Sequence, residues 1–453
     1  MNTFSVFFST SLVALTIALP PLAAPAWADD RDLQSRVDDL EATIDALRSE
    51  IADIRKSPEF KPSPNFKSAD GSSSFKVRGQ LAINAAAFNT KKGLVDQNSG
   101  ADISRARLGV DGTFAKDWAY RFEADFSKAS RDDTATPSEL DVKDAYLSYG
   151  GFGEKWKVTV GQQKTPNTLA RGNPSADGLF IGTPLAVEAF TNRSTAGGDY
   201  KIGTLAKYTD VNWTAEAGIF GENLAAQGGT TAVSKDEGWG PAARLTWAPV
   251  NKPDATLHLG ASGYYRTAGG RNSIRFRSGP EVTVDGARLV DTGNITGIDN
   301  YAFEGLELGV IYGPLFFQSE YLLTQVDRKL GSALSFEGAY AEFAYALTGE
   351  SHGYKAGSFS RILPKKPFNL AAGTWGAWEI ATRYSTLDLT DGAFSGGKQS
   401  NWSLGINWYP NDYVRVLANY VNYDAKDSFA APPVAGSFSN AGDAVLTEVS
   451  VTW

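Results

Sequence analysis

Two successive runs of the chain, residues 103–114 and 118–126, alternate strictly between two sets of side chains. A period of two predicts β-strands, and the short turn at Lys116-Asp117 predicts an antiparallel hairpin. The two faces of the first run carry Ser104, Ala106, Leu108, Val110, Gly112 and Phe114 against Ile103, Arg105, Arg107, Gly109 and Asp111. In the second run Trp118, Tyr120, Phe122, Ala124 and Phe126 alternate with Arg121, Glu123 and Asp125. A soluble sandwich would bury the apolar face against a second sheet, whereas a membrane barrel would turn it to lipid and point the charges into an aqueous lumen.

The same alternation recurs in about sixteen segments, the first at residues 75–88 and the last at residues 443–453. Connections alternate in length: Gly313-Pro314 is short, whereas residues 164–197 are long. An even strand number with long loops on one side and short turns on the other is typical of outer-membrane barrels. Residues 348–373 are long yet fall on the short side, so either a segment is miscounted or this turn is elaborated. We therefore predict an all-β fold, an antiparallel transmembrane β-barrel over residues 75–453.

The first 74 residues follow other patterns. Residues 4–19 are an apolar run and residues 26–28 are Ala-Trp-Ala, which predicts a cleaved secretory signal peptide over residues 1–28; the alternative is a retained hydrophobic anchor. Residues 29–57 place apolar side chains at 4-3-4-3 spacing, which predicts an α-helical coiled coil, with a single amphipathic helix as the alternative. These positions are Leu33, Val37, Leu40, Ile44, Leu47, Ile51 and Ile54. Residues 58–74 are rich in proline, glycine and serine and are predicted to be a linker.

Composition excludes several classes of function. Cysteine is absent, so disulfides and thiolate metal sites are excluded, and His258 and His352 are the two histidines of the chain. A net charge of −8 argues against nucleic acid as a partner. Beyond the first ~30 residues there is no run of ~18 apolar residues, so an ordinary transmembrane helix is not expected. We predict no cofactor and no metal.

Several stretches resemble the phosphate-selective porin O and P family. They include S-R-A-R-L-G-V-D-G-T-F-A-K-D-W at residues 104–118, K-D-A-Y-L-S-Y at 143–149, V-G-Q-Q-K-T-P at 160–166 and L-G-I-N-W-Y-P-N-D-Y-V-R-V at 404–416. The resemblance covers residues 75–453. It implies a sixteen-stranded, trimeric porin of the Gram-negative outer membrane, whose lumen uses arginine and lysine to pass anions, and whose third long loop folds into the pore.

Strand parity assigns a set of basic side chains to the lumen, and the long loop after Lys164 adds others. These pore-lining candidates are Arg78, Arg105, Arg107, Arg121, Lys157, Lys164, Arg171, Arg193 and Lys201. Rings of arginine and lysine are the usual device of anion pores, and the guanidinium fork matches an oxyanion. Inward acids are almost as numerous, however, so the alternative is that the bases pair with facing acids and stiffen the wall.

The function predicted is passive diffusion of small inorganic anions, including phosphate-like oxyanions, through a water-filled channel in outer-membrane lipid. The alternatives are a general or cation-selective porin, or a barrel that anchors a working coiled coil with periplasmic or cell-wall contacts. We predict no enzymatic activity, because no G-x-S-x-G or H-E-x-x-H motif occurs and a lone strand histidine such as His258 is usually structural.

Overall fold

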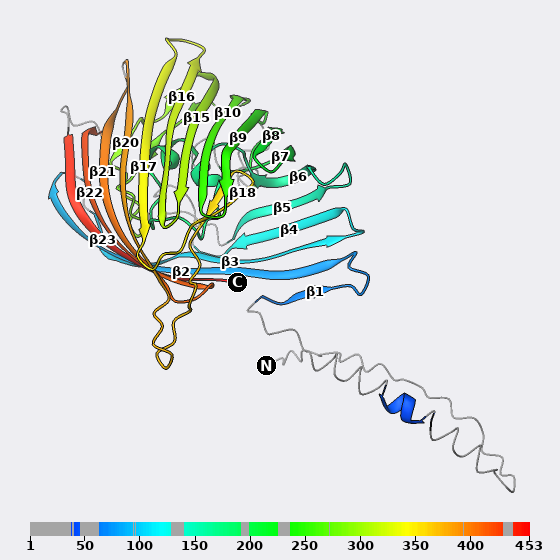
Figure 1. Ribbon diagram of the computed structural model, residues 1–453. Coiled ribbons are helices and arrows are strands. Elements are labelled where there is room, and N and C mark those ends of the chain that lie inside the picture. Colours follow the sequence, from blue (N-terminus) through cyan, green and yellow to red (C-terminus); the bar gives the residue numbers. More distant parts are fainter. Residues whose placement is uncertain are drawn as a thin grey trace, which may run out of the picture. The chain divides into compact units, whose positions relative to one another are not determined.

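The structure is a computed structural model, which describes residues 38, 40–45, 63–93, 95, 97–127, 140–191, 199–224, 236–270, 272–392, 394–428 and 438–453. Seventeen strands form one antiparallel sheet, in which the first strand, β1 (Asn65–Lys67), pairs with β2 alone. The other sixteen close into a barrel through the pairing of β2 with β23 (Figure 1). They are β2 (Ser74–Lys92), β3 (Gly100–Phe114), β4 (Trp118–Asp125), β5 (Asp141–Tyr149), β6 (Trp156–Lys164), β7 (Tyr200–Thr209), β8 (Trp213–Phe220), β9 (Gly240–Lys252), β10 (Ala255–Thr267), β15 (Ile298–Tyr312), β16 (Leu315–Arg328), β17 (Leu334–Ala346), β20 (Ala377–Asp391), β21 (Phe394–Tyr409), β22 (Val414–Ser428) and β23 (Phe438–Thr452). The predicted sixteen-stranded barrel is confirmed.

The chain divides into two compact units, residues 1–61 and residues 62–453. In the first unit residue 38 and residues 40–45 are helical, which agrees with the predicted heptad helix over this short part. The predicted signal peptide and the rest of the coiled coil lie outside the described residues. Within the predicted linker, residues 65–67 form strand β1 against β2, so this part of the linker is ordered. Among the described residues, no helix has the length and apolar character needed to cross a membrane.

Apolar side chains face outward and charged side chains face inward, as the alternation predicts. Phe122 and Leu108 lie exposed on the outer surface, whereas Arg121, Glu123 and Asp125 point inward. One residue departs from the prediction: Ile103 does not share the inward face of Arg105. The pairing of β3 with β2 shifts register between these two positions, and Ile103 then pairs with the outward residue Ile83. A β-bulge inserts one extra residue and so reverses the parity of everything beyond it.

Aromatic side chains collect on the outer surface at the ends of strands that short turns join. The ring centroids of Phe114 and Trp118 lie 6.0 Å apart across one turn, and those of Trp378 and Trp408 are stacked at 5.5 Å. Tyrosine and tryptophan prefer the boundary between lipid and water, because their rings are apolar and their tips are polar. The short-turn rim of the barrel therefore carries a belt suited to one membrane interface.

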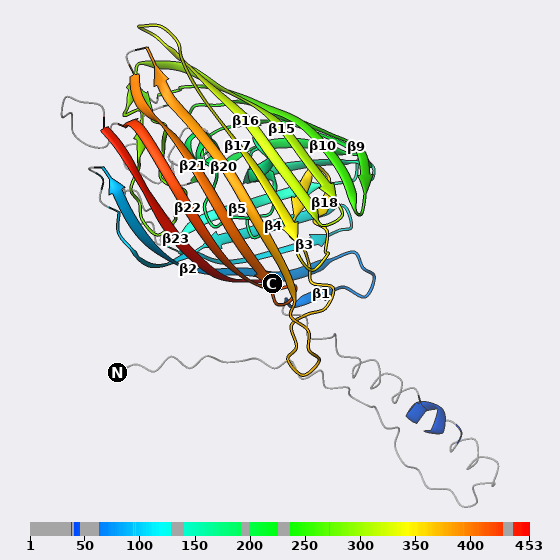
Figure 2. The ribbon, with the colours of Figure 1, turned by 60° about the vertical axis from the view of Figure 1, so that its left-hand side comes forward.

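Three connections between strands enter the barrel, two of them along most of their length and the third in part (Figure 2). Residues 165–191 follow β6 and contain α2 (Leu169–Gly172) and α3 (Leu185–Thr191). Residues 268–297 follow β10 and form the short pairs β11 (Ser273–Ile274) with β14 (Ile295–Thr296), and β12 (Arg277–Ser278) with β13 (Val290–Asp291). Residues 347–376 contain the pair β18 (Gly353–Lys355) and β19 (Ser358–Ser360). The long connection on the short-turn side is therefore an elaborated turn, and the predicted number of strands is correct.

Candidate functional site

The segment of residues 165–191 crosses the lumen from β6 to the opposite wall. Its far part is held by side chains of β21 and β22. The Arg415 guanidinium donates to the carbonyl of Gly178 at 2.8 Å, and Asn419 accepts from the amide of Ile181 at 2.9 Å. Asn407 of β21 donates to the carbonyl of Leu179 at 3.1 Å. Bonds from two wall strands therefore fix this segment across the channel, so it narrows the passage.

The near part of the same segment is anchored by a buried carboxylate. Glu320 of β16 accepts from the amides of Leu169 and Ala170 at 2.6 and 2.9 Å, and from the Tyr340 hydroxyl at 2.7 Å. The first amides of a helix lack main-chain partners, and a carboxylate there satisfies them. Thr168 caps the same turn by accepting from the amide of Arg171.

The segment of residues 268–297 packs on top of α3 and joins it to the wall. Glu281 accepts from the amide of Leu185 at 2.9 Å and from the guanidinium of Arg383 at 2.7 Å. Its backbone has φ of 62°, a conformation that non-glycine residues rarely adopt. The two buried hydrogen bonds hold Glu281 in this strained backbone conformation.

The third segment, residues 347–376, enters from the short-turn side, and both histidines of the chain hold it. His258 on β10 contacts the Tyr354 hydroxyl at 2.9 Å and Glu307 at 3.0 Å. His352, within the segment, contacts Glu379 of β20 at 2.6 Å. Phe359 of β19 is buried in the lumen. His258 therefore links a segment to the wall, which agrees with its interpretation as a structural residue.

These three segments divide the inner wall into a covered half and an accessible half. The inward arginines of the later strands are buried: the side chains of Arg383 and Arg415 are 2% and 1% exposed. On the first strands the side chains of Arg78 and Arg121 are each 30% exposed. The solvated part of the lumen therefore includes the wall formed by β2 to β4, which we call the open wall.

Charged side chains form a continuous network on the open wall. Arg78 lies between two carboxylates, with its nitrogens 3.3 Å from Asp111 and 3.3 Å from Glu123. Arg107 is 3.6 Å from the same Glu123, and Arg121 is 4.0 Å from the same Asp111. Because each carboxylate is shared by two arginines, the network runs across β2, β3 and β4 without a break.

The remaining predicted residues occupy different surroundings. Arg105 lies 3.6 Å from Glu448 of β23, and Lys157 pairs across the strands with Lys207 near the short-turn rim. Lys164, at the end of β6, donates to the carbonyl of Arg171 at 2.8 Å, so it binds the main chain of the crossing segment. Lys201 is buried, with its ammonium 2.8 Å from Glu222.

The loop cations were predicted from sequence position alone. Arg171 lies 3.4 Å from Glu188 and 3.8 Å from Asp199, so it links α2 to α3 and to the residue that precedes β7. Burial pushes the pKa of Asp199 upward, but Arg171 and neighbouring lysines outweigh it, and the net pKa of Asp199 is lowered. Arg193 lies outside the described residues.

Comparison with known proteins decides the family. Residues 75–446 match the model of a family described as phosphate-selective porin O and P. The chain belongs to this family of outer-membrane porins. This porin is 27% identical over 387 residues to Porin O of Pseudomonas aeruginosa, which covers 77% of this chain and 82% of that protein. It is 30% identical over 369 residues to an uncharacterized protein of Caulobacter vibrioides, which covers 80% of this chain and 70% of that one.

Solved structures resemble the porin in fold alone, because their sequence identity is low. OmpT of Vibrio cholerae superposes with a TM-score of 0.53 at 12% identity, over 86% of this chain and 100% of that one. An anion-selective porin from Comamonas acidovorans gives a TM-score of 0.50 at 16% identity, over 83% and 99% of the two chains. The fold of an outer-membrane porin is thus shared with proteins of little sequence similarity.

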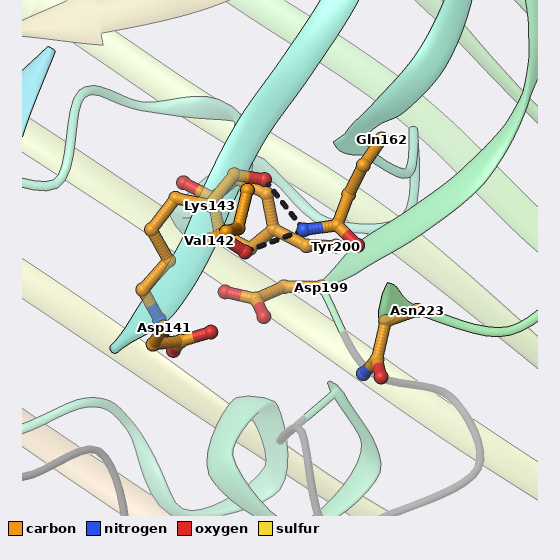
Figure 3. A pocket seen from close by; sticks show the side chains of 7 residues that line it. All are labelled: Asp141, Val142, Lys143, Gln162, Asp199, Tyr200 and Asn223. Carbon is orange, nitrogen blue, oxygen red and sulfur yellow. Dashed lines mark hydrogen bonds and ion pairs between the residues drawn. The ribbon is translucent and has the colours of Figure 1, made fainter. Parts of the chain in front are cut away.

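A small pocket of the porin lies between β5, β6, the start of β7 and Asn223, which follows β8 (Figure 3). The Lys143 ammonium is 2.7 Å from Asp141 and lies 5.5 Å from the ring centroid of Tyr200. Gln162 donates to the carbonyl of Lys143 at 3.1 Å, and Asp199 points into the same space. Acids and a base share this pocket, and no described residues form a group of three or more acidic, histidine or cysteine ligands for a metal.

The sequence did not predict the anchoring role of several residues that shape the channel of this porin, although strand parity assigns Glu320 to the lumen. Glu320, Glu281 and Phe359 determine where the three segments lie, and each is part of a region that is unremarkable in sequence. The signal available was the unusual length of residues 348–373 on the short-turn side. It indicated an insertion but not its direction.

Proposed function

We propose that this porin conducts small anions, with a preference for oxyanions, along the open wall. The observation that carries the proposal is that basic side chains of the open wall are more exposed to the lumen than most of its acidic side chains. Arg78 and Arg121 extend into the lumen with 30% of their side chains exposed, whereas the side chains of Asp125 and Asp144 are 6% and 10% exposed. A solute in the lumen therefore meets guanidinium groups before it meets most of the carboxylates.

Arginine suits this role because one guanidinium carries five donors in a planar fork. The salt bridges of Arg78 engage Nη1 and Nε, so the group retains donors for a passing solute. Conduction requires that binding be favourable enough to admit an ion and weak enough to release it. Carboxylates behind the arginines lower the local positive potential, which favours rapid exchange over tight binding.

The test removes either the charge or only the planar fork of Arg78 and Arg121, the two arginines of the open-wall network that are 30% exposed. Arg78→Gln with Arg121→Gln is compared with Arg78→Lys with Arg121→Lys in planar bilayers under a salt gradient. At about 1 kcal/mol for each of the two exposed charges, we expect the glutamine pair to lower the anion-to-cation permeability ratio roughly thirty-fold. The lysine pair should keep the sign of the selectivity while reducing block by phosphate, because lysine offers a point charge.

An unchanged reversal potential in the folded glutamine pair would refute the role of these arginines. A second candidate function is a general or cation-selective porin, which Asp111 favours, because this carboxylate lies between both arginines with 32% of its side chain exposed. Cation preference in the wild-type channel would select that alternative. A folded protein that does not conduct would favour the barrel as an anchor.

We also propose that the porin is a homotrimer with its coiled coil in the periplasm. One solved OmpT of Vibrio cholerae is described as a trimer form, and the family resemblance points the same way. The heptads of residues 33–54 would join the same three chains through a linker, after removal of a signal peptide over residues 1–28. Light scattering of the mature protein in mild detergent should give three chains, and a protein that starts at residue 62 should dissociate at a lower temperature. A monomeric mature protein would contradict the proposal.

A further inference from the structure

The outer half of the connection between β17 and β20, residues 365–376, is an ordered hairpin that projects from the short-turn rim. Asn369 and Thr374 exchange two main-chain hydrogen bonds of 3.0 Å each, and the Asn369 side chain accepts from the amide of Ala372 at 3.2 Å. Gly373 closes the turn with φ of 65°. Figures 1 and 2 show it as the yellow-orange loop beyond the ends of β17 and β20. We call these residues the rim hairpin.

The base of the rim hairpin packs on the lipid-facing surface of the barrel. The carbonyl of Trp375 accepts from the indole nitrogens of Trp378 at 3.2 Å and of Trp408 at 2.8 Å. The ring of Phe368 meets the ring of Trp408 edge-on, with centroids 5.4 Å apart. Trp378 and Trp408 alternate with the inward residues Glu379 and Asn407, so they belong to the aromatic belt on the outside. The rim hairpin is therefore a continuation of that belt.

The side chains of the rim hairpin are apolar and basic. Leu370 is 71% exposed and Trp375 is 61% exposed. Lys365 and Lys366 stand at its base, and residues 363–377 contain no aspartate or glutamate. The Lys365 ammonium donates to the carbonyl of Gly349 at 2.6 Å, so Lys366 is the residue whose charge serves an external partner. Large apolar side chains exposed on an ordered hairpin indicate an interaction surface.

We propose that the rim hairpin binds the interfacial region of the periplasmic leaflet, with Leu370 and Trp375 at the boundary of headgroups and acyl chains and Lys366 beside an anionic lipid phosphate. Continuity with the lipid-facing belt selects lipid as the partner. The combination of aromatic, aliphatic and lysine side chains without acids is complementary to an anionic membrane surface. The hairpin would hold the barrel at a fixed depth, and the inference does not depend on which ions the channel passes.

The first experiment measures where Trp375 lies in the full-length porin reconstituted in phosphatidylcholine and phosphatidylglycerol bilayers. The difference in fluorescence between wild type and Trp375→Phe reports this residue, and its carbonyl bonds to the belt are main-chain and are retained. We expect this difference signal to be quenched by phospholipids brominated near the headgroup and to be protected from iodide. Quenching by iodide alone would place the hairpin in water and overturn the proposal. Protection from both quenchers would mean that protein covers it, which also overturns the proposal.

The second experiment changes the lipid contact without changing Trp375. Leu370→Asp should shift the Trp375 signal to longer wavelength and expose it to iodide. The matched control is Leu330→Asp, at an 88% exposed leucine outside this hairpin, which should leave the signal unchanged. Lys366→Gln should reduce the preference of brominated phosphatidylglycerol over brominated phosphatidylcholine as quencher by about five-fold. Equal quenching by the two lipids in wild type would remove the charge-based part of the proposal.

Discussion

Phe359 is the residue on which the inward position of the β18–β19 pair should depend most. Its side chain is 2% exposed and belongs to the buried cluster that contains Leu169 and Phe316. Its ring centroid lies 5.1 Å from that of Phe316 and 5.5 Å from the ring of His258. Replacing a buried phenylalanine by alanine costs about 3–5 kcal/mol, because it removes the apolar contact and leaves a cavity.

The cost of Phe359→Ala should appear as local opening of the β18–β19 pair. The polar attachments of this pair remain in the variant, including the bonds of Arg244 to the Gly357 carbonyl and of Asn173 to the Phe359 amide, both 2.8 Å. The lost packing alone then changes the opening equilibrium, and about 3 kcal/mol corresponds to an increase of roughly a hundred-fold. Open-channel conductance should also rise, because an opened segment leaves more of the lumen to water.

Hydrogen exchange of the main-chain amides at residues 353–360 measures this opening directly. We expect these amides to exchange about a hundred-fold faster in Phe359→Ala, with the amides of β20 unchanged. Phe343→Ala is the matched control, because Phe343 is 43% exposed on the outer face of the neighbouring strand β17. Unchanged exchange in correctly folded Phe359→Ala would refute the reasoning that apolar packing holds the segment inside.

Two further predictions concern the other segments. Glu281→Ala should destabilise residues 272–297 by about 3 kcal/mol, because the amide of Leu185 and the Arg383 guanidinium both lose a buried partner. Limited proteolysis should then cleave this segment faster than in the wild type. Glu281→Gln should give an intermediate rate of cleavage. Burial raises the pKa of Asp177, which lies 3.6 Å from Arg361. Its ionised form therefore costs stability at neutral pH, and this cost disappears as the pH falls through the raised pKa. Anion preference should increase over that acidic range as the carboxylate loses its charge, and Asp177→Asn should abolish this step in the reversal potential.

The barrel could be predicted from the sequence because its signal is local. Each strand displays its own period of two, and cross-strand pairing preserves the division into faces. The bulge beside Ile103 could not be predicted in the same way, since a register shift depends on how β3 pairs with β2. The positions of the inward segments depend on partners far apart in sequence. Glu320 stands about 150 residues after the amides that it binds, and on its own strand it looks like any inward polar residue.

The charge that a permeating ion meets also depends on these long-range contacts. Counted by strand parity, inward bases and acids are nearly equal, which predicts no preference for either sign. The inward segments bury part of the wall, and this changes how many charged side chains of each sign face the solvated lumen. The Arg415–Glu448 pair, 2.8 Å apart, is covered by the crossing segment and contributes little to the solvated lumen. Arg78 makes similar pairs but remains exposed, so its field reaches the solute. Selectivity in this barrel therefore depends on which wall the segments leave uncovered, and a substitution that releases a segment should change selectivity without altering any charge.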